Sequence, residues 1–499
     1  MTQDTFWEQI IEKIKLAPFV RITTAFIIGI VMEWFALVFL VLLFFRKLSF
    51  LRVYVVIVLL GALLRIGERE PKIMPSECMT VSTLRVDEFL SRNYLSCSLI
   101  AYSVAGEKTV HEGKGRILLE LDTLYSAFLD RYDTIRLKTY IEDINKDKID
   151  ANSYRASLER KGYSQLAICY EENEIEIARN LESYKGLKQL TSDIQQRCVE
   201  HLNGLELSQK DMGILSAMIA GEREQVDKKV RNMYVEGGIS HVLAISGLHV
   251  GIVFLFFNLL LKVMDRWYRM KVCKTVLIIL LLWGYAFITG LSPSVCRATL
   301  MFSLFAVGSL SEIHSEMHRY NILFASAFLI LLVRPALLFD VGFQLSYLSV
   351  LAILFFIPKI EQVVRIRHGV FRYLFFSVAV TVVVQLFTAP VTLYSFGQFS
   401  FVSVLNNVVV TTLLPVILFA SLCYMAFPVG FFSIIIRFAF DVINYFLEIT
   451  LQLPCAGVEE VVFYLSDLFW SFFAIFLIMI AVEISYMAFK EKQLLKTNN

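Results

Sequence analysis

Charged residues are scarce in this sequence: Asp, Glu, Lys and Arg make up 18% of its 499 residues, whereas apolar residues make up 57%. So few charges leave too little polar surface to solvate a soluble protein of this length. The apolar residues are also gathered in long runs, such as 250–261, 276–287, 322–333 and 472–482, which suit membrane spans better than a soluble core. The composition therefore predicts a polytopic α-helical membrane protein.

Sequence motifs for several kinds of chemistry are also missing. There is no H-E-x-x-H zinc motif, no G-x-x-x-x-G-K-[ST] nucleotide loop and no dinucleotide-binding fingerprint. None of the eight cysteines shows the C-x-x-C spacing of a metal site. We therefore expect no metal, no cofactor and no ATP-driven motor in this sequence.

The N-terminal residues 1–66 read as a membrane anchor. They contain two apolar stretches with a basic break at Arg46, Lys47 and Arg52, and they lack the cleavage site of a removable signal peptide. The usual length of a span favours two segments, with Glu33 in the middle of a run. Three segments would instead keep both the N-terminal tail and the basic break inside, so both versions stay open.

A polar insert follows at residues 67–173. Apolar residues alternate with polar ones over 98–104, 117–121, 135–141 and 165–170, which predicts short strands of a small barrel or sheet. From Glu174 the pattern has helical periodicity, so we expect connecting helices over 174–206. Ser208 and Asp211 then fit a capping box that starts another helix.

Charge asymmetry gives the expected orientation. Lys and Arg concentrate in the loops 262–274 and 359–372 and in the tail 490–496, and the positive-inside rule places all three in the cytoplasm. Four apolar segments lie between each successive pair, so the chain returns to the same side each time. The segment 239–261 would then enter from outside, which makes the insert extracytoplasmic.

Four cysteines belong to the insert or to the segment after it: Cys78, Cys97, Cys169 and Cys198. Outside the cytoplasm a disulfide among them is one expectation, with three complete pairings open. Buried free thiols are the other.

The candidate functional residues stand in four stretches where polar groups interrupt apolar segments. They are His241, Ser246, Gly247 and His249 in the first, Arg297 in the second, Asp340 and Gln344 in the third, and Gln398 and Asn407 in the fourth. Burying such groups costs free energy unless they face a polar cavity or one another, so we expect them to line or gate a path. The alternatives are hydrogen bonds between helices for the amides and an Arg297–Asp340 ion pair.

A hydrolase triad could also be assembled from Ser246, His249 and Asp340, although no G-x-S-x-G elbow surrounds the serine. It would need the Ser246 hydroxyl within hydrogen-bond distance of a histidine. A membrane-embedded hydrolase or a small-solute transporter is therefore the alternative function.

Taken together, the four stretches resemble the ComEC-type competence proteins, membrane channels that carry transforming DNA across the bacterial cytoplasmic membrane. HVLAISGLHVG at 241–251 is similar to the most distinctive motif of that family, and AMIAGEREQVD at 217–227 precedes it. PSVCRATLM, DVGFQLSYLSVLAI and FGQFS follow in the family's order, at 293–301, 340–353 and 396–400. The resemblance implies a channel domain at 207–430 that imports single-stranded DNA and is not an enzyme, followed by membrane helices and a cytoplasmic tail at 431–499.

The same resemblance implies that the insert is an OB-like domain, a small β-rich barrel that lies outside the cytoplasm after the N-terminal membrane segments. Such barrels bind single strands with aromatic and basic side chains. The candidates here are Arg131, Tyr132, Arg136, Lys138, Tyr140, Tyr154 and Arg155. A solvated polar face is the alternative.

Many members of the family end in a metallo-β-lactamase-like domain. No histidine follows His368 here, so we expect that domain and its nuclease function to be absent. The resemblance implies a location in the cell membrane, with single-stranded DNA, the lipid bilayer, a DNA receptor, a separate nuclease and a cytoplasmic motor as partners, and a homo-oligomer as one possibility.

Overall fold

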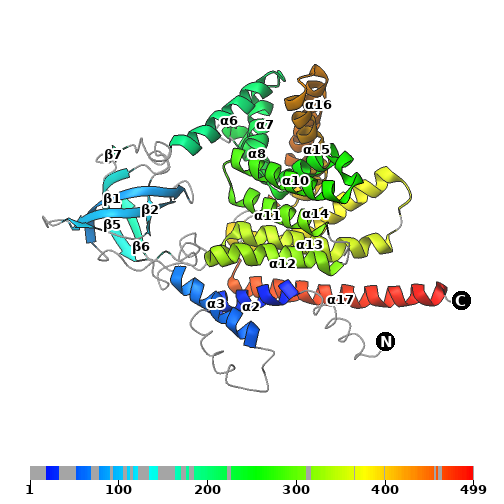
Figure 1. Cartoon of the computed structure of the whole chain (residues 1–499), viewed down its shortest axis with the longest axis horizontal. Helices are drawn as coiled ribbons and strands as arrows, with labels where there is room; N and C mark the ends of the chain where they lie inside the picture. Colours follow the sequence, from blue (N-terminus) through cyan, green and yellow to red (C-terminus); the bar gives the residue numbers. More distant parts are fainter. Residues whose placement is uncertain are drawn as a thin grey trace. The chain divides into compact units, whose positions relative to one another are not determined.

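The computed structural model describes most of the chain, and the following account is confined to those residues. They are 18–32, 52–68, 78–89, 94–104, 110–112, 116–121, 134–143, 163, 165–169, 176–178, 185–221, 226–310, 316–364, 366–397, 399–453, 457–458 and 463–497. The chain divides into two compact units (Figure 1). One comprises Ile22–Lys188 with Leu329–Asp340, and the other comprises Met1–Arg21, Gln189–Phe328 and Val341–Asn499.

The first unit contains a closed five-stranded barrel. Its strands are β1 (Cys78–Phe89), β2 (Tyr94–Val104), β4 (Arg116–Glu120), β5 (Thr134–Asp143) and β6 (Gln165–Cys169). They are joined in the order β1-β2-β4-β6-β5, and β5 pairs back onto β1. The β4–β6 pair is parallel and the other barrel pairs are antiparallel. This small closed barrel is OB-like, and its strands confirm the alternation read from the sequence.

The barrel interior is apolar along most of its length and hydroxyl-lined at one place. Leu84, Leu95, Ile117 and Ile135 belong to its buried core. Beyond them, the hydroxyl groups of Thr80, Ser82 and Thr139 are buried and lie 2.8–3.0 Å from one another. Each hydroxyl both donates and accepts hydrogen bonds, so the three satisfy one another without water.

Two short strands extend the barrel sheet. β3 (His111–Glu112) pairs with β2, and β7 (Glu176–Ala178) pairs with β5. The prediction of helices throughout 174–206 is therefore wrong at its start, because α6 begins only at Lys185 and ends at Asn203. The reason is visible in the sequence: Glu174, Ile175, Glu176 and Ile177 alternate with the period of a strand.

The helices α2 (Pro18–Met32) and α3 (Arg52–Glu68) meet at two glycines. A Cβ at Gly29 would lie 1.9 Å from the carbonyl oxygen of Val58, and a Cβ at Gly61 would lie 2.4 Å from that of Phe26. Only glycine allows backbones to approach this closely. The basic break at residues 46 and 47 lies outside the described residues, so the number of N-terminal segments stays a prediction.

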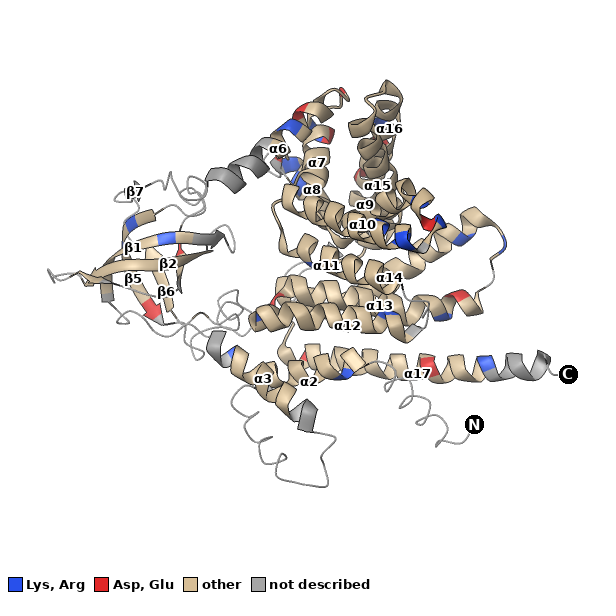
Figure 2. Ribbon diagram, viewed as in Figure 1, with Lys and Arg blue, Asp and Glu red and all other residues tan. Residues whose placement is uncertain are grey.

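The second unit is helical. Within the described residues, six helices are long and apolar enough to cross a bilayer: α10 (Tyr268–Ile288), α13 (Val341–Val363), α14 (Gly369–Phe396), α15 (Ser403–Ala426), α16 (Gly430–Leu451) and α17 (Leu465–Thr497). Lys and Arg gather at the start of α10 and around the link between α13 and α14 (Figure 2). Away from these ends, each of the six helices contains an apolar stretch of 18 residues with at most two charged side chains.

Three further apolar helices are shorter: α9 (Gly247–Leu260), α11 (Pro293–Gly308) and α12 (Glu316–Val333). With its 14 residues, α9 spans about 21 Å, which is less than the ~30 Å hydrocarbon thickness. The segment predicted to cross at 239–261 is thus helical over its second half, because glycines precede it and Ser246 is its N-cap.

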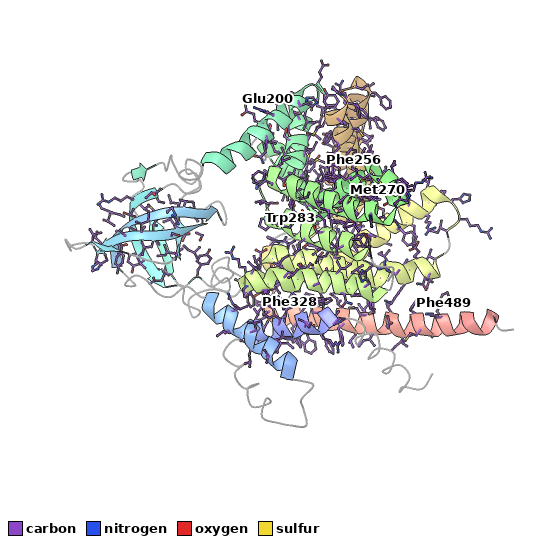
Figure 3. The ribbon with its side chains drawn as sticks, in the orientation of Figure 1. Glu200, Phe256, Met270, Trp283, Phe328 and Phe489 are labelled. Atoms are coloured by element: carbon purple, nitrogen blue, oxygen red, sulfur yellow. The ribbon has the colours of Figure 1, made fainter. Side chains whose placement is uncertain are left out.

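Besides a cluster that joins α13, α14 and α17 through Phe356, Phe387 and Ile475, two apolar clusters hold this unit together. The larger joins α6, α7 (Gln209–Ile219), α8 (Lys228–Glu236), α15 and α16 through buried residues such as Leu202, Leu215, Tyr234, Leu418 and Phe440. The smaller joins α9, α10 and α11 through Val250, Leu282 and Val295. Phe256 of α9, labelled in Figure 3, packs edge to face on Phe419 of α15 with ring centroids 5.0 Å apart, which links the two clusters.

The turn after α6 is fixed by α16. The Ser433 hydroxyl donates to the Leu205 carbonyl at 2.6 Å, and the Arg437 guanidinium donates to the Glu206 carbonyl at 2.8 Å. Glu206 has a φ of +52°, a left-handed conformation that costs free energy for any residue except glycine. After the turn, Ser208 and Asp211 form the predicted cap of α7, with the Asp211 amide donating to the Ser208 hydroxyl.

Candidate functional site

The histidine stretch forms a short connector between α8 and α9. After α8, Gly237 and Gly238 make a turn in which Gly238 has a φ of +69°. The connector then passes through a single 3-10 turn, Ser240–Val242, and reaches Ser246, the residue before α9. His241 is exposed on this connector and His249 is fully buried in the first turn of α9, so the two candidate histidines occupy different environments.

Ser246 and His249 hold the start of α9 together. The Nδ1 atom of His249 accepts the backbone N–H of Ser246 at 3.2 Å and lies 2.9 Å from the Ser246 hydroxyl. A ring nitrogen that accepts an N–H carries no proton in the neutral ring, so we assign the proton to Nε2. Within the described part of the chain, that Nε2 atom is buried and has no hydrogen-bond partner.

This pair meets the distance that a hydrolase would require, but its geometry is that of a helix cap. The same Nδ1 atom serves the backbone of Ser246, and the opposite ring nitrogen has no acceptor in the described chain to orient it. A catalytic triad needs that third group. The arrangement therefore favours a structural role for the Ser246–His249 contact.

The arginine stretch packs directly on the histidine stretch. Gly247 lies against Ala298 of α11, since a Cβ there would be 3.7 Å from the Ala298 Cβ, and a Cβ at Gly251 would be 2.9 Å from the ring of Phe302. Just before α11, Thr289 lies beside Gly221, the glycine of the predicted AMIAG segment, with 3.2 Å between a Cβ there and the threonine carbonyl oxygen. The histidine stretch thus packs on the arginine stretch, and the AMIAG segment lies beside the residue that precedes the arginine stretch.

Arg297 links α11 to α13. It is 7% exposed, and its guanidinium donates to the Gly342 carbonyl at 3.1 Å. Gln344 is half-buried two residues further along α13. Asp340 belongs to the other compact unit, so its pairing with Arg297 stays a prediction.

The amide stretch contacts the connector through Asn406, the neighbour of the candidate Asn407. The Asn406 side chain donates to the Gly237 carbonyl at 2.9 Å, whereas the buried Oδ1 of Asn407 has no hydrogen-bond partner among the described residues. Adjacent residues on a helix point about 100° apart, so a doublet of amides does not reveal which one faces a neighbour. Gln398 lies outside the described residues.

On the barrel, three DNA-binding candidates share the outer face of β5. Arg136, Lys138 and Tyr140 alternate with the buried Ile135, Leu137, Thr139 and Ile141. On the neighbouring strand β1, Arg85 pairs in register with Thr134 and is exposed, so it extends this basic face and was missed from the sequence. Arg131, Tyr132, Tyr154 and Arg155 lie outside the described residues.

The cysteines of the insert are dispersed. Cys97 is buried in the barrel core, Cys169 packs against that core, and Cys78 begins β1. Cys198 is a free thiol on α6, and burial raises its pKa. The disulfide stays a prediction. Among the described residues no group of three or more His, Cys, Asp or Glu side chains could hold a metal ion.

Comparisons with known proteins identify a family and two related proteins. A family model described as Competence protein matches residues 218–486, more than half of the chain. The chain is 32% identical to ComE operon protein 3 of Bacillus subtilis (strain 168) over 231 residues, which are 46% of this chain and 28% of that protein. It is 30% identical over 166 residues to an uncharacterized protein of Aquifex aeolicus (strain VF5), covering 32% of this chain and 35% of that protein. The chain therefore matches about a third or less of the length of each relative. No solved structure matches it.

Proposed function

Because the chain belongs to the Competence protein family, we propose that it is a membrane channel that imports single-stranded transforming DNA across the cytoplasmic membrane. The observation that carries the proposal is the meeting of distant polar stretches at one place in a helical membrane unit. Gly237 contacts Asn406, Gly247 contacts Ala298, and Arg297 binds the carbonyl of Gly342. Polar groups that gather inside an apolar bundle are the usual mark of a transport path.

Within this path we assign His241 the outermost role, because it is exposed on a connector between buried segments. An imidazole can donate a hydrogen bond to a phosphate oxygen. His249 would act behind it, through its Nε2 donor. Arg297 would add a permanent positive charge at the neighbouring helix.

The barrel would receive the strand on the side from which it enters. This assignment supposes the orientation that the basic loops predict, with residues 67–173 outside and the C-terminal tail inside. Arg85, Arg136, Lys138 and Tyr140 supply the basic and aromatic groups that single-strand binding uses. A receptor, a nuclease and a cytoplasmic motor would be separate proteins.

A DNA-uptake assay tests the proposal. In a host that is otherwise competent, deletion of the gene should abolish the arrival of labelled DNA in the cytoplasm, and the full chain should restore it. The His241→Ala variant should reduce uptake while the protein remains in the membrane. His368→Ala is the matched control, because that histidine is exposed before α14 and lies in none of the four stretches. Normal uptake in the deletion strain would refute the channel.

A further inference from the structure

A buried hydrogen-bonded pair from α15 and α16 holds the first residue of the connector. Asn406 donates from Nδ2 to the Gly237 carbonyl at 2.9 Å, and its Oδ1 accepts the Thr450 hydroxyl at 2.8 Å. Both side chains are 2% exposed. Since water does not reach either group, the loss of one partner leaves the other unsatisfied.

Neighbouring residues strengthen the same attachment. The Ser400 hydroxyl donates to the Glu236 carbonyl at 3.1 Å, and the Gln385 amide of α14 donates to the Ser403 hydroxyl at 2.7 Å. Gly238 leaves no space on this side, because a Cβ there would be 2.3 Å from the Cβ of Ser403. The last residue of α8 and the first two residues of the connector are therefore held by α15 and the residues just before it. Thr450 of α16 and Gln385 of α14 support these contacts by binding Asn406 and Ser403.

The connector is fixed at its other end as well. Ser246 is bound to His249 through both its backbone and its hydroxyl. Between the two attachments, Ile239, Val242 and Ile245 are buried, whereas Ser240 and His241 are exposed. The position of His241 thus depends on two polar attachments, one at each end of the connector.

We infer that Asn406 and Thr450 are positioning residues, which set the place of the connector and of His241 without touching the imidazole. The role of His241 in DNA import rests on the proposed function, but the mechanical part of the inference does not. Asn406 of α15 binds the backbone carbonyl of Gly237, and Thr450 of α16 binds Asn406 and the Leu447 carbonyl of its own helix. Removing the Thr450 hydroxyl should therefore loosen the connector and leave the helices in place.

The test compares substitutions that remove a threonine hydroxyl with one that keeps it. Thr450→Val removes the hydroxyl and keeps the volume, and Thr450→Ser keeps the hydroxyl. Thr381→Val is the matched control, because Thr381 is equally buried but its hydroxyl donates only to a carbonyl of its own helix. Two quantities are measured on the full chain: DNA uptake per amount of membrane protein, and hydrogen–deuterium exchange of backbone amides in residues 237–246.

We expect Thr450→Val to lower uptake and to speed exchange of the connector, each by about ten-fold, the effect of a lost buried hydrogen-bond partner. Thr450→Ser and Thr381→Val should behave like the parent chain, and the thermal unfolding midpoint should stay within a few degrees. Unchanged uptake and exchange in Thr450→Val would overturn the inference. Equal losses in Thr381→Val would do the same, because they would indicate a general effect of removing a hydroxyl.

The inference can still be tested in two other cases. If Thr450→Val does not accumulate in the membrane, Ser400→Ala takes its place, since it removes the hydroxyl that donates to the Glu236 carbonyl near the surface. No change in uptake or exchange there would then refute the positioning role. If the parent chain does not restore DNA uptake, the channel proposal fails by itself. The exchange difference between Thr450→Val and Thr450→Ser still tests the attachment.

Discussion

Gly238→Ala should be strongly destabilising, and the structure separates two causes. The residue has a φ of +69°, and an L-residue in this conformation costs about 1–2 kcal/mol. Its added Cβ would also lie 2.3 Å from the Cβ of Ser403 and 3.0 Å from that of Ser400, and forcing a methyl group into a packed site costs about 1–3 kcal/mol. Together the free energy of unfolding should fall by about 2–5 kcal/mol.

Two other glycines provide the controls. Gly290 has a similar φ of +77° but open space around its missing Cβ, so Gly290→Ala should lose only the conformational cost of about 1–2 kcal/mol. Gly284 lies inside α10, also with open space, and alanine there should stabilise the helix by up to about 1 kcal/mol.

Thermal unfolding of the purified full chain in detergent, followed by tryptophan fluorescence, gives the order of the three variants. The expected midpoints rise from Gly238→Ala through Gly290→Ala to Gly284→Ala. If Gly238→Ala and Gly290→Ala unfold together, the contact with Ser403 adds nothing and the reasoning from packing is refuted.

Two further predictions concern single residues. Thr139→Val should destabilise the barrel by about 1–3 kcal/mol, since Thr80 and Ser82 lose a buried hydrogen-bond partner. Thr134→Val, on the outer side of the same strand, should change the stability of the barrel by no more than about 0.5 kcal/mol. Hydrogen–deuterium exchange of the barrel strands measures both effects, and equal effects would contradict a stabilising role of the hydroxyl cluster. Glu206→Gly should raise the unfolding midpoint, because glycine removes a left-handed strain of about 1–2 kcal/mol; a lower midpoint would show that the glutamate side chain contributes more than the strain costs.

The sequence predicted those parts of the fold whose pattern is set by burial alone. Apolar periodicity located β4, β5 and β6. The alternation is strict in β5, because Ile135, Leu137 and Ile141 face the barrel core. β1 was harder to delimit, since the inward positions of its first half are the hydroxyl residues Thr80 and Ser82. Their polarity is satisfied by contacts with Thr139 on another strand, which a single-sequence pattern does not contain.

The candidate site was predictable in its location and not in its contacts. His241 and Ser246 were recognised as polar groups in an apolar region, and the structure brings their stretch against Ala298 and Gly237's partner Asn406. The capping role of His249 was missed, because the usual residue at that position of a capping box is Glu or Gln. Asn407 was chosen as the candidate in place of Asn406, because the helical phase that distinguishes the two residues depends on how α15 packs.

The hydrogen bonds that fix the turn after α6 join residues far apart in the chain, and this has a consequence for synthesis. The Leu205 carbonyl accepts its hydrogen bond from Ser433, which is synthesised 228 residues later, and the Glu206 carbonyl accepts from Arg437, 231 residues later. At a translation rate of about 5–20 residues per second, that interval is roughly 10–45 s. During that interval neither of these two hydrogen bonds can form, so the turn between α6 and α7 is fixed only after α16 has been synthesised.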